Sequence, residues 1–343
     1  MTNLNLGIIG NCTVNAAIDQ MGRIVWSCYP RPDGDPVFHA LLNGSDPFAP
    51  SARGFCSIEI ENFKHAEQHY VQNTAVLKTI LNDGNGNALE ITDFSPRFEL
   101  FGRMYCPASY VRRVVPLSGR PRIRVRMRPG FEYGSTAPVI TRGSHHIRYV
   151  NPVQTLRLTT DLPLSYVIDE TCFGLDRPAN LVFGADEPID EALAPMARRF
   201  EEQTIRCWRD WVRPLALPLE WQDAVIRAAI TLKMCTFEDT GAILAAMTTS
   251  IPEAADTGRN WDYRFCWLRV AFFCRPRLQQ SLRRGHDGEL PAISVQHCAG
   301  RRIARAPATG VRHRDGGDLN RAICGLAARL SRHGTRAYRQ SGI

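Results

Sequence analysis

Long runs of apolar residues are missing from this sequence. No stretch of about 18 residues is apolar throughout, which excludes a membrane-spanning helix of ordinary length. The first ten residues also lack the basic start and the long apolar region of a secretory signal peptide. We therefore expect a cytoplasmic protein that does not bind a membrane.

Closely paired cysteines are missing too. The chain has 11 cysteines, but none are spaced as Cys-x-x-Cys and no histidine cluster accompanies them. This argues against a structural zinc site and, with the expected location, against a disulfide framework. The Gly-x-Ser-x-Gly sequence of many serine hydrolases is absent as well. We predict no metal and no cofactor.

Lysine disappears from the last part of the chain. Residues 274–343 contain 14 arginines, no lysine and 4 acidic residues, a balance of +10, whereas residues 1–273 have a balance of −2. With its poor apolar periodicity, this segment is expected to be an irregular or disordered Arg-rich tail. Clustered arginines are typical of nucleic-acid binding, but the only aromatic residue there for base stacking is Tyr338. A basic nucleic-acid-binding protein stays an alternative function, although we expect no specific nucleic-acid partner.

Residues 1–185 have the pattern of an antiparallel β-sandwich. Short runs rich in β-branched and aromatic residues recur, several of them alternating apolar and polar side chains, with turn sequences between them. No helical pattern intervenes, which argues against a parallel sheet. The predicted strands are Leu6–Ile9, Ile24–Ser27, Phe55–Glu61, Ala75–Leu81, Leu89–Asp93, Tyr110–Val115, Ile123–Met127, Ile147–Val150 and Thr155–Thr159.

The pattern becomes helical after the predicted sandwich. Residues 186–218 are expected to form a helical linker, because apolar residues fall at helical spacing over Asp190–Val212. A second helix is predicted over Glu220–Glu238 and a third over Asp262–Phe273.

The segment Arg259–Arg269 has the composition of a sugar-binding site. It reads Arg-Asn-Trp-Asp-Tyr-Arg-Phe-Cys-Trp-Leu-Arg. Aromatic rings stack on the C–H face of a pyranose, and guanidinium and carboxylate groups hydrogen-bond to its hydroxyls. The alternative interpretation is structural, with an ion-pair cluster at a helix start and the tryptophans in the core. The residues alone leave both interpretations open.

Several sequences along residues 1–273 together resemble one enzyme family. They are Asn11-Cys12-Thr13, Gly22-Arg23-Ile24-Val25-Trp26, Cys28-Tyr29-Pro30-Arg31-Pro32-Asp33, Ile91-Thr92-Asp93-Phe94, Val111-Arg112-Arg113-Val114, Thr248-Thr249-Ser250-Ile251-Pro252-Glu253 and the segment Arg259–Arg269. In these the chain resembles glycoside hydrolase family 15, which contains glucoamylases and bacterial trehalases. The resemblance implies a trehalase-like N-terminal β-sandwich, a helical linker and an (α/α)₆ barrel. Residues 219–273 would supply the first helices of an incomplete barrel.

The resemblance also implies a reaction and a set of sugar contacts. Family members hydrolyse α-linked glucose with inversion, using a carboxylic acid and a carboxylate roughly 6.5–9.5 Å apart. Trp267 and Arg269 would line the pocket for the terminal glucose. Asp262 and Arg264 would brace the motif, and Trp261 would pack nearby. The implied partner is an α-glucoside or α-glucan of the trehalose, maltodextrin or dextran type.

Two departures from the family pattern modify this expectation. The family has an aspartate directly after Trp-Leu-Arg, whereas this chain has Val270, which cannot accept hydrogen bonds from glucose hydroxyls. The family's general acid and general base lie beyond this motif, and residues 274–343 do not resemble the barrel. We therefore assign no catalytic residue.

The Arg-rich tail suggests a change of reading frame. Cys274–Ser281 and Arg336–Gly342 can each be encoded by nucleotides that, displaced by one, specify family-like sequences. We hypothesise a frameshifted, truncated family member whose last 70 residues are out of frame, and we expect it to be inactive. A non-catalytic carbohydrate-binding β-sandwich is a further alternative.

Overall fold

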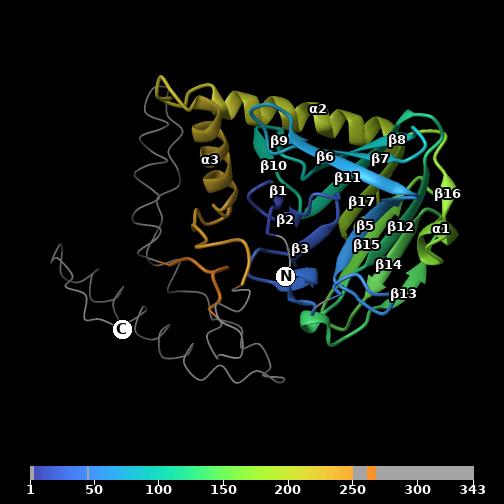
Figure 1. Ribbon diagram of the computed structural model, residues 1–343. Coiled ribbons are helices and arrows are strands. Elements are labelled where there is room, and N and C mark those ends of the chain that lie inside the picture. Colours follow the sequence, from blue (N-terminus) through green and yellow to red (C-terminus); the bar gives the residue numbers. More distant parts are fainter. Residues whose placement is uncertain (1–3, 45, 250–260, 268–343) are drawn as a thin grey trace.

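Two antiparallel sheets stack face to face and form the body of the molecule (Figure 1). The computed structural model describes residues 4–44, 46–249 and 261–267. One sheet has seven strands in the order β1-β2-β3-β5-β12-β16, with β4 paired to β3. The other has eight strands in the order β13-β14-β15-β17-β11-β8-β7-β6. This architecture confirms the predicted antiparallel β-sandwich.

The strands are short and follow one another closely. The seven-stranded sheet contains β1 (Gly7–Gly10), β2 (Asn15–Ile18), β3 (Ile24–Tyr29), β4 (Asp35–Phe38), β5 (Phe55–Ile60), β12 (Arg122–Arg128) and β16 (Phe173–Gly174). The eight-stranded sheet contains β6 (Phe63–Tyr70), β7 (Leu77–Asp83), β8 (Ala88–Phe94), β11 (Ser109–Ser118), β13 (Val139–Arg142), β14 (His146–Val150), β15 (Thr155–Thr160) and β17 (Ala179–Ala185). The remaining short elements are β9 (Phe98–Leu100), β10 (Arg103–Tyr105), η1 (Ala40–Leu42), η2 (Glu132–Gly134) and α1 (Leu164–Ile168).

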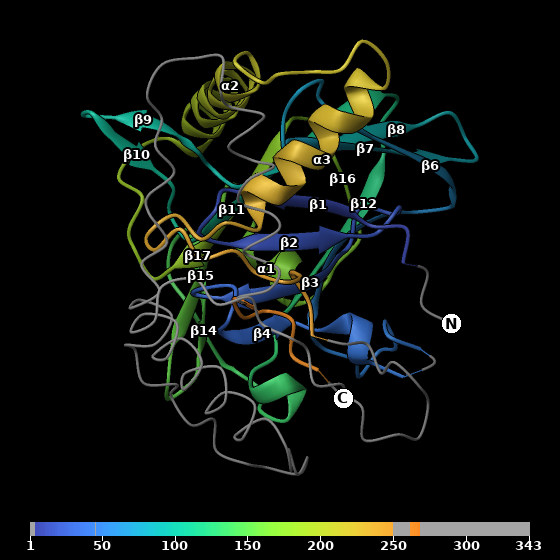
Figure 2. The ribbon, with the colours of Figure 1, turned by 90° about the vertical axis from the view of Figure 1, so that its left-hand side faces the viewer.

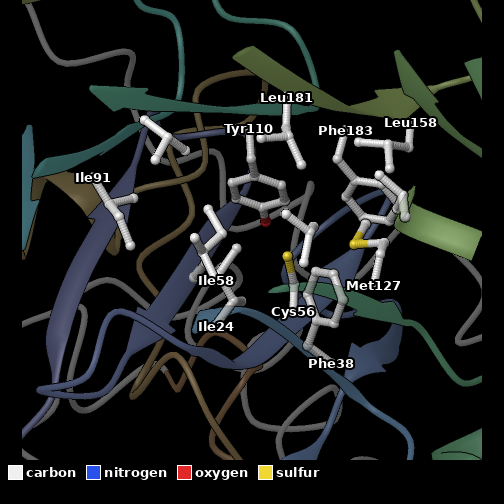
Figure 3. Close-up of a cluster of buried hydrophobic side chains, with 14 of the residues drawn as sticks. Ile24, Phe38, Cys56, Ile58, Ile91, Tyr110, Met127, Leu158, Leu181 and Phe183 are labelled. Atoms are coloured by element: carbon white, nitrogen blue, oxygen red, sulfur yellow. The ribbon is translucent and has the colours of Figure 1, made fainter. Parts of the chain in front are cut away.

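The main core lies between the two sheets. Alternation along the strands sends every second side chain inward, as in β7, whose residues are buried and half-buried in turn. Figure 3 shows Ile24 and Ile58 of the seven-stranded sheet opposite Leu181 and Phe183 of the eight-stranded sheet, and all four are buried. The sandwich therefore has the closely packed interior expected of a stable domain.

Polar side chains also join the two sheets. The Tyr110 hydroxyl on β11 lies 2.6 Å from the Ser27 hydroxyl on β3, and both residues are fully buried. Arg112 forms a two-point ion pair with Asp93 inside the eight-stranded sheet and also donates to the carbonyl of Cys56 on β5 at 3.2 Å. These hydrogen bonds offset the cost of removing the polar groups from water.

All of the predicted strands are present, with ends shifted by one or two residues at most positions. The predictions missed eight strands, some polar and exposed and others, such as β17, apolar and buried. These are β2, β4, β6, β9, β10, β13, β16 and β17. Strand β6 is an edge strand with polar residues along most of its length, and β13 is exposed throughout.

Two long helices pack on the outside of the sandwich, α2 (Leu193–Val212) and α3 (Gln222–Met234). They correspond to the first two predicted helices. Helix α2 lies across the eight-stranded sheet, where Ala197 packs with Val111 of β11 (Figure 1). Helix α3 runs past β1, and its Ile226 and Ile230 pack with Cys12 (Figure 2). Over the described residues no helix is both long and apolar enough to cross a membrane.

The third predicted helix, over Asp262–Phe273, is wrong where the structure describes it. Residues 262–266 instead form isolated antiparallel bridges, with Asp262 opposite Thr249 and Cys266 opposite Leu244. The Asp262 carboxylate accepts a hydrogen bond from the backbone N–H of Arg264 at 3.1 Å, a local turn that competes with helix formation. Residues 268–273 and the Arg-rich tail lie outside the described residues.

Candidate functional site

Residues 261–267, here called the aromatic strip, lie beside the segment 244–249 in an extended arrangement. The backbone N–H of Ala246 donates to the carbonyl of Tyr263 at 2.9 Å, and that of Ala245 donates to the carbonyl of Phe265 at 3.1 Å. Together with the two isolated bridges, these bonds set the register between the two segments.

The segment 244–249 is in turn attached to the sandwich. The indole N–H of Trp26, which is fully buried on β3, donates to the carbonyl of Met247 at 2.9 Å. Near the end of α3 the backbone N–H of Glu238 donates to the carbonyl of Cys12 at 2.8 Å, and the Cys12 thiol donates to the carbonyl of Lys233 at 3.3 Å. The chain that leads to the strip is therefore held by β3 and by the turn after β1.

Arg264 is the central anchor of the aromatic strip. Its side chain is buried, and all five guanidinium N–H groups have acceptors. Nε and Nη2 donate to the two carboxylate oxygens of Asp262 at 2.9 and 2.7 Å. Nη1 donates to the carbonyl of Gly34 at 2.5 Å and to the sulfur of Cys28 at 3.3 Å, and Nη2 also donates to the hydroxyl of Tyr133 at 2.7 Å.

The charges around Arg264 are fixed by burial and by these hydrogen bonds. Burial acts to lower the pKa of Arg264, but the hydrogen bond to Asp262 and the nearby Cys28, Asp262 and Tyr133 outweigh it, so the pKa lies above its ordinary value. Burial raises the pKa of the Cys28 thiol to about 11, although Arg264 works against that rise. At neutral pH the anchor is therefore a permanent cation beside a neutral thiol.

Aromatic rings gather on the strip around this anchor. Trp267 stacks on Tyr263, with 6.0 Å between ring centroids and 28° between ring planes. Trp261 and Phe265 keep 40% and 42% of their surface exposed. Exposed rings on a firmly held backbone are suited to stacking against the C–H face of a sugar.

A second ion-pair cluster holds the segment between α3 and the strip. Arg97 is buried and donates to both carboxylate oxygens of Glu238, at 3.0 and 3.2 Å, and to the carbonyl of Asn11 at 2.9 Å. Lys233 lies 3.3 Å from the same carboxylate. Burial alone would raise the pKa of Glu238, but Arg97 and Lys233 reverse the effect and lower it.

The structure brings Asp262 and Arg264 into direct contact and places Trp261 and Trp267 on the same strip. Arg269 and Val270 lie outside the described residues. Sequence reasoning missed the acceptors of Arg264 on the sandwich, the Gly34 carbonyl and the Tyr133 hydroxyl. Gly34 directly follows one of the family-like sequences, which was a usable signal, whereas nothing near Tyr133 in the sequence points to a partner at residue 264.

The described residues contain no metal-like cluster, and two surface hollows lie away from the aromatic strip. Within residues 4–44, 46–249 and 261–267, no three His, Cys, Asp or Glu side chains gather closely enough to hold a metal ion. Two surface hollows occur on the sandwich, one lined by residues that include Arg128, Tyr149 and Glu170 and the other by residues that include Leu6 and Tyr70. Neither hollow is lined by residues of the aromatic strip.

Several known trehalases are similar to this chain. Residues 4–160 match a family model described as trehalase-like, N-terminal. Trehalase 1 of Sulfolobus acidocaldarius is 32% identical over 271 residues, which is 77% of this chain and 43% of that protein. A trehalase of Thermoplasma volcanium is 28% identical over 77% of this chain and 42% of that protein, and a trehalase of Mycolicibacterium smegmatis is 28% identical over 78% and 43%.

The chain spans less than half the length of these curated relatives. A solved YidC insertase structure has a TM-score of only 0.33 and 12% identity over 66% of this chain and 49% of that chain, which is too low to inform the fold. The trehalase-like region includes the turn after β1 and the β3 residues that hold the strip. The N-terminal family match and the trehalase relatives support a trehalase-type, glycoside hydrolase family 15 assignment for this chain.

Proposed function

We propose that the aromatic strip forms one wall of a binding site for an α-glucoside of the trehalose type. The observation that carries this proposal is the use of Arg264, which gives all five of its donors to protein groups and so fixes the strip, while Trp261 stays 40% exposed. A rigid backbone lowers the entropy cost of binding, and a partly exposed indole ring is suited to packing against a pyranose.

The residues divide into two roles under this proposal. Trp267 and Arg269 contact the terminal glucose, as the family resemblance implies, with Trp261 beside them. Arg264 has no free donor for a sugar, so it and Asp262 brace the strip and do not touch the substrate.

The chemistry proposed for the family type is hydrolysis with inversion. It needs an acid and a base roughly 6.5–9.5 Å apart, with a water molecule between them. No residue of this chain is assigned to either role, and residues 274–343 do not resemble the barrel that carries them in the family. We therefore propose that this chain is a glycoside hydrolase-like protein that recognises an α-glucoside without turning it over.

Two measurements on the full chain test this function. Calorimetric titration with trehalose should give binding that cellobiose, with its β-linkage, does not reproduce. Trp267→Ala should weaken trehalose binding about tenfold, because stacking on an aromatic ring is worth roughly 1–3 kcal/mol, judged by analogy with base stacking. Trp221→Ala is the matched control, since Trp221 is an exposed tryptophan at the start of α3.

The glucose-release assay completes the test. No glucose should appear from trehalose, maltose or dextrin above the blank. Measurable turnover would disprove the proposed inactivity, and equal trehalose binding by wild type and Trp267→Ala would remove the aromatic strip from the site.

A non-catalytic sugar-binding sandwich is the second candidate. The hollow lined in part by Arg128 and Glu170 favours it, because charged groups that can hydrogen-bond to sugar hydroxyls border a concavity on the sandwich itself. Trehalose binding that survives Trp267→Ala but weakens in Arg128→Ala would support this candidate over the first.

A further inference from the structure

Tyr133, whose hydroxyl accepts a hydrogen bond from Arg264, lies on a turn with unusual backbone angles. Element η2 contains three consecutive residues with positive φ, Glu132 at 51°, Tyr133 at 57° and Gly134 at 89°. Positive φ is uncommon for residues other than glycine, and two adjacent non-glycine cases require the surroundings to hold them in place.

The neighbouring Asp35 on β4 holds this turn. Its carboxylate accepts hydrogen bonds from the backbone N–H groups of Glu132 at 2.6 Å and Tyr133 at 3.4 Å. On the other side, Phe131 and Thr136 exchange backbone hydrogen bonds at 3.1 and 3.2 Å. The third residue must be small, because a Cβ on Gly134 would lie 2.6 Å from the His39 ring.

The η2 turn and the residue just before β4 each provide a hydrogen-bond acceptor for Arg264. The Tyr133 hydroxyl accepts from Nη2 at 2.7 Å, and the carbonyl of Gly34, the residue before Asp35, accepts from Nη1 at 2.5 Å. The two acceptors come from parts of the chain about a hundred residues apart, and both lie far in sequence from residue 264. Packing alone does not explain the position of the Tyr133 side chain. It is still 51% exposed, although its hydroxyl accepts a hydrogen bond from Arg264.

We propose that Tyr133 and Asp35 are positioning residues of the candidate sugar site. Asp35 keeps the η2 turn in its strained conformation, the turn presents the Tyr133 hydroxyl, and the hydroxyl fixes Arg264 and with it the aromatic strip. The consequence for sugar binding rests on the proposed function above, whereas the docking of the strip does not.

Amide hydrogen exchange of the full chain tests the docking directly. The informative amides are those of Ala245 and Ala246, which donate to carbonyls of the strip, and that of Arg264. Tyr133→Phe removes only the hydroxyl and should speed exchange of these amides about 3- to 10-fold, the effect of one lost hydrogen bond on a local opening. Peptides from β11 in the sandwich core should not change.

Two further variants distinguish positioning from general destabilisation. Asp35→Ala should speed exchange of the same amides at least as much as Tyr133→Phe, and Asp35→Asn, which keeps one acceptor oxygen, should lie between Asp35→Ala and wild type. Tyr166→Phe, on α1, is the matched control and should leave all of these amides unchanged.

The outcomes are decisive in both directions. Unchanged exchange at Ala245, Ala246 and Arg264 in both Tyr133→Phe and Asp35→Ala would overturn the proposal, as would equal acceleration across β11. Trehalose titration of the same proteins separates the two ideas. If wild type binds no trehalose while the exchange result holds, the proposed function fails and the positioning role stands. If both hold, Tyr133→Phe should bind trehalose several-fold more weakly.

Discussion

Arg112 of β11 and Asp93 of β8 form a two-point ion pair in the interior of the sandwich, with Nε 2.7 Å from one carboxylate oxygen and Nη2 3.0 Å from the other. Both side chains are almost entirely inaccessible, at 3% and 0% exposure. Because Arg112 also donates to carbonyls of Gly22 and Cys56, the pair joins the two sheets.

Asp93→Ala should therefore destabilise the sandwich strongly. The substitution leaves a buried guanidinium without its counter-charge, which costs about 3–5 kcal/mol in free energy of unfolding. Urea denaturation followed by tryptophan fluorescence would measure it. Asp176→Ala is the control, because it breaks the exposed pair with Arg120 and should change stability by less than about 1 kcal/mol. Similar losses in the two variants would show that the buried pair has no special role.

Arg264→Lys should loosen the aromatic strip although it preserves the charge. A lysine ammonium cannot reach Asp262, Gly34 and Tyr133 at the same time, so several hydrogen bonds are lost at a cost of roughly 1–3 kcal/mol. Thermal unfolding and tryptophan emission would report the change. Arg31→Lys offers a matched control, since Arg31 pairs with Asp33 two residues away at an exposed position. A strip that is equally stable in both variants would contradict the central role given to Arg264.

His39 should make the fold sensitive to mild acid. It is buried, its Nε2 has no hydrogen-bond partner, and burial lowers its pKa from 6.5. The unfolded chain therefore takes up a proton before the folded chain does. Stability is complete above pH 6.5 and falls as the pH drops below it, by at most about 1.4 kcal/mol per pH unit, until the folded state is protonated too.

The pH effect can be isolated by substitution. The difference in unfolding free energy between wild type and His39→Gln should change with pH between about 6.5 and 5. A constant difference for His39→Gln would mean that this histidine does not titrate as its surroundings indicate.

The out-of-frame hypothesis for residues 274–343 makes a prediction about nucleic acid sequence. The encoding DNA, read with a displacement of one nucleotide near codon 274, should continue with an open frame that resembles the family barrel. Sequencing the locus tests this. A displaced frame that is closed by stop codons, or that encodes nothing similar to the family, would refute the hypothesis.

Local sequence patterns identified much of the interior of the sandwich, although the central strand β17 was missed. Ile123, Val125 and Met127 alternate with arginines, and all three point into the core from β12. The pattern was insufficient at the edge, where β6 keeps its polar residues in solvent and derives its strand conformation from pairing with β7. Residues 63–70 therefore form a strand because they pair with β7, and not because their side chains favour the strand conformation.

The candidate site was predictable only in part for the same reason. Its composition marked the strip, and the turn formed by Asp262 and Arg264 is a local interaction. The helix predicted over the strip was wrong because its periodicity suited a helix while its hydrogen bonds go to Ala245 and Ala246. Tyr133 could not be found from the sequence, because its role depends on two left-handed residues and a contact 131 positions away.

The packing of α3 over β1 has a consequence for synthesis of the chain. Ile8 and Cys12 are synthesised more than two hundred residues before Ile226 and Ile230, the α3 residues that pack over them. At translation rates of about 5–20 residues per second this interval lasts roughly ten seconds or longer. During that time the apolar face around Ile8 and Cys12 is not covered by α3. Ribosome stalling between α2 and α3 would prolong the exposure of this aggregation-prone surface, which holdase chaperones should bind.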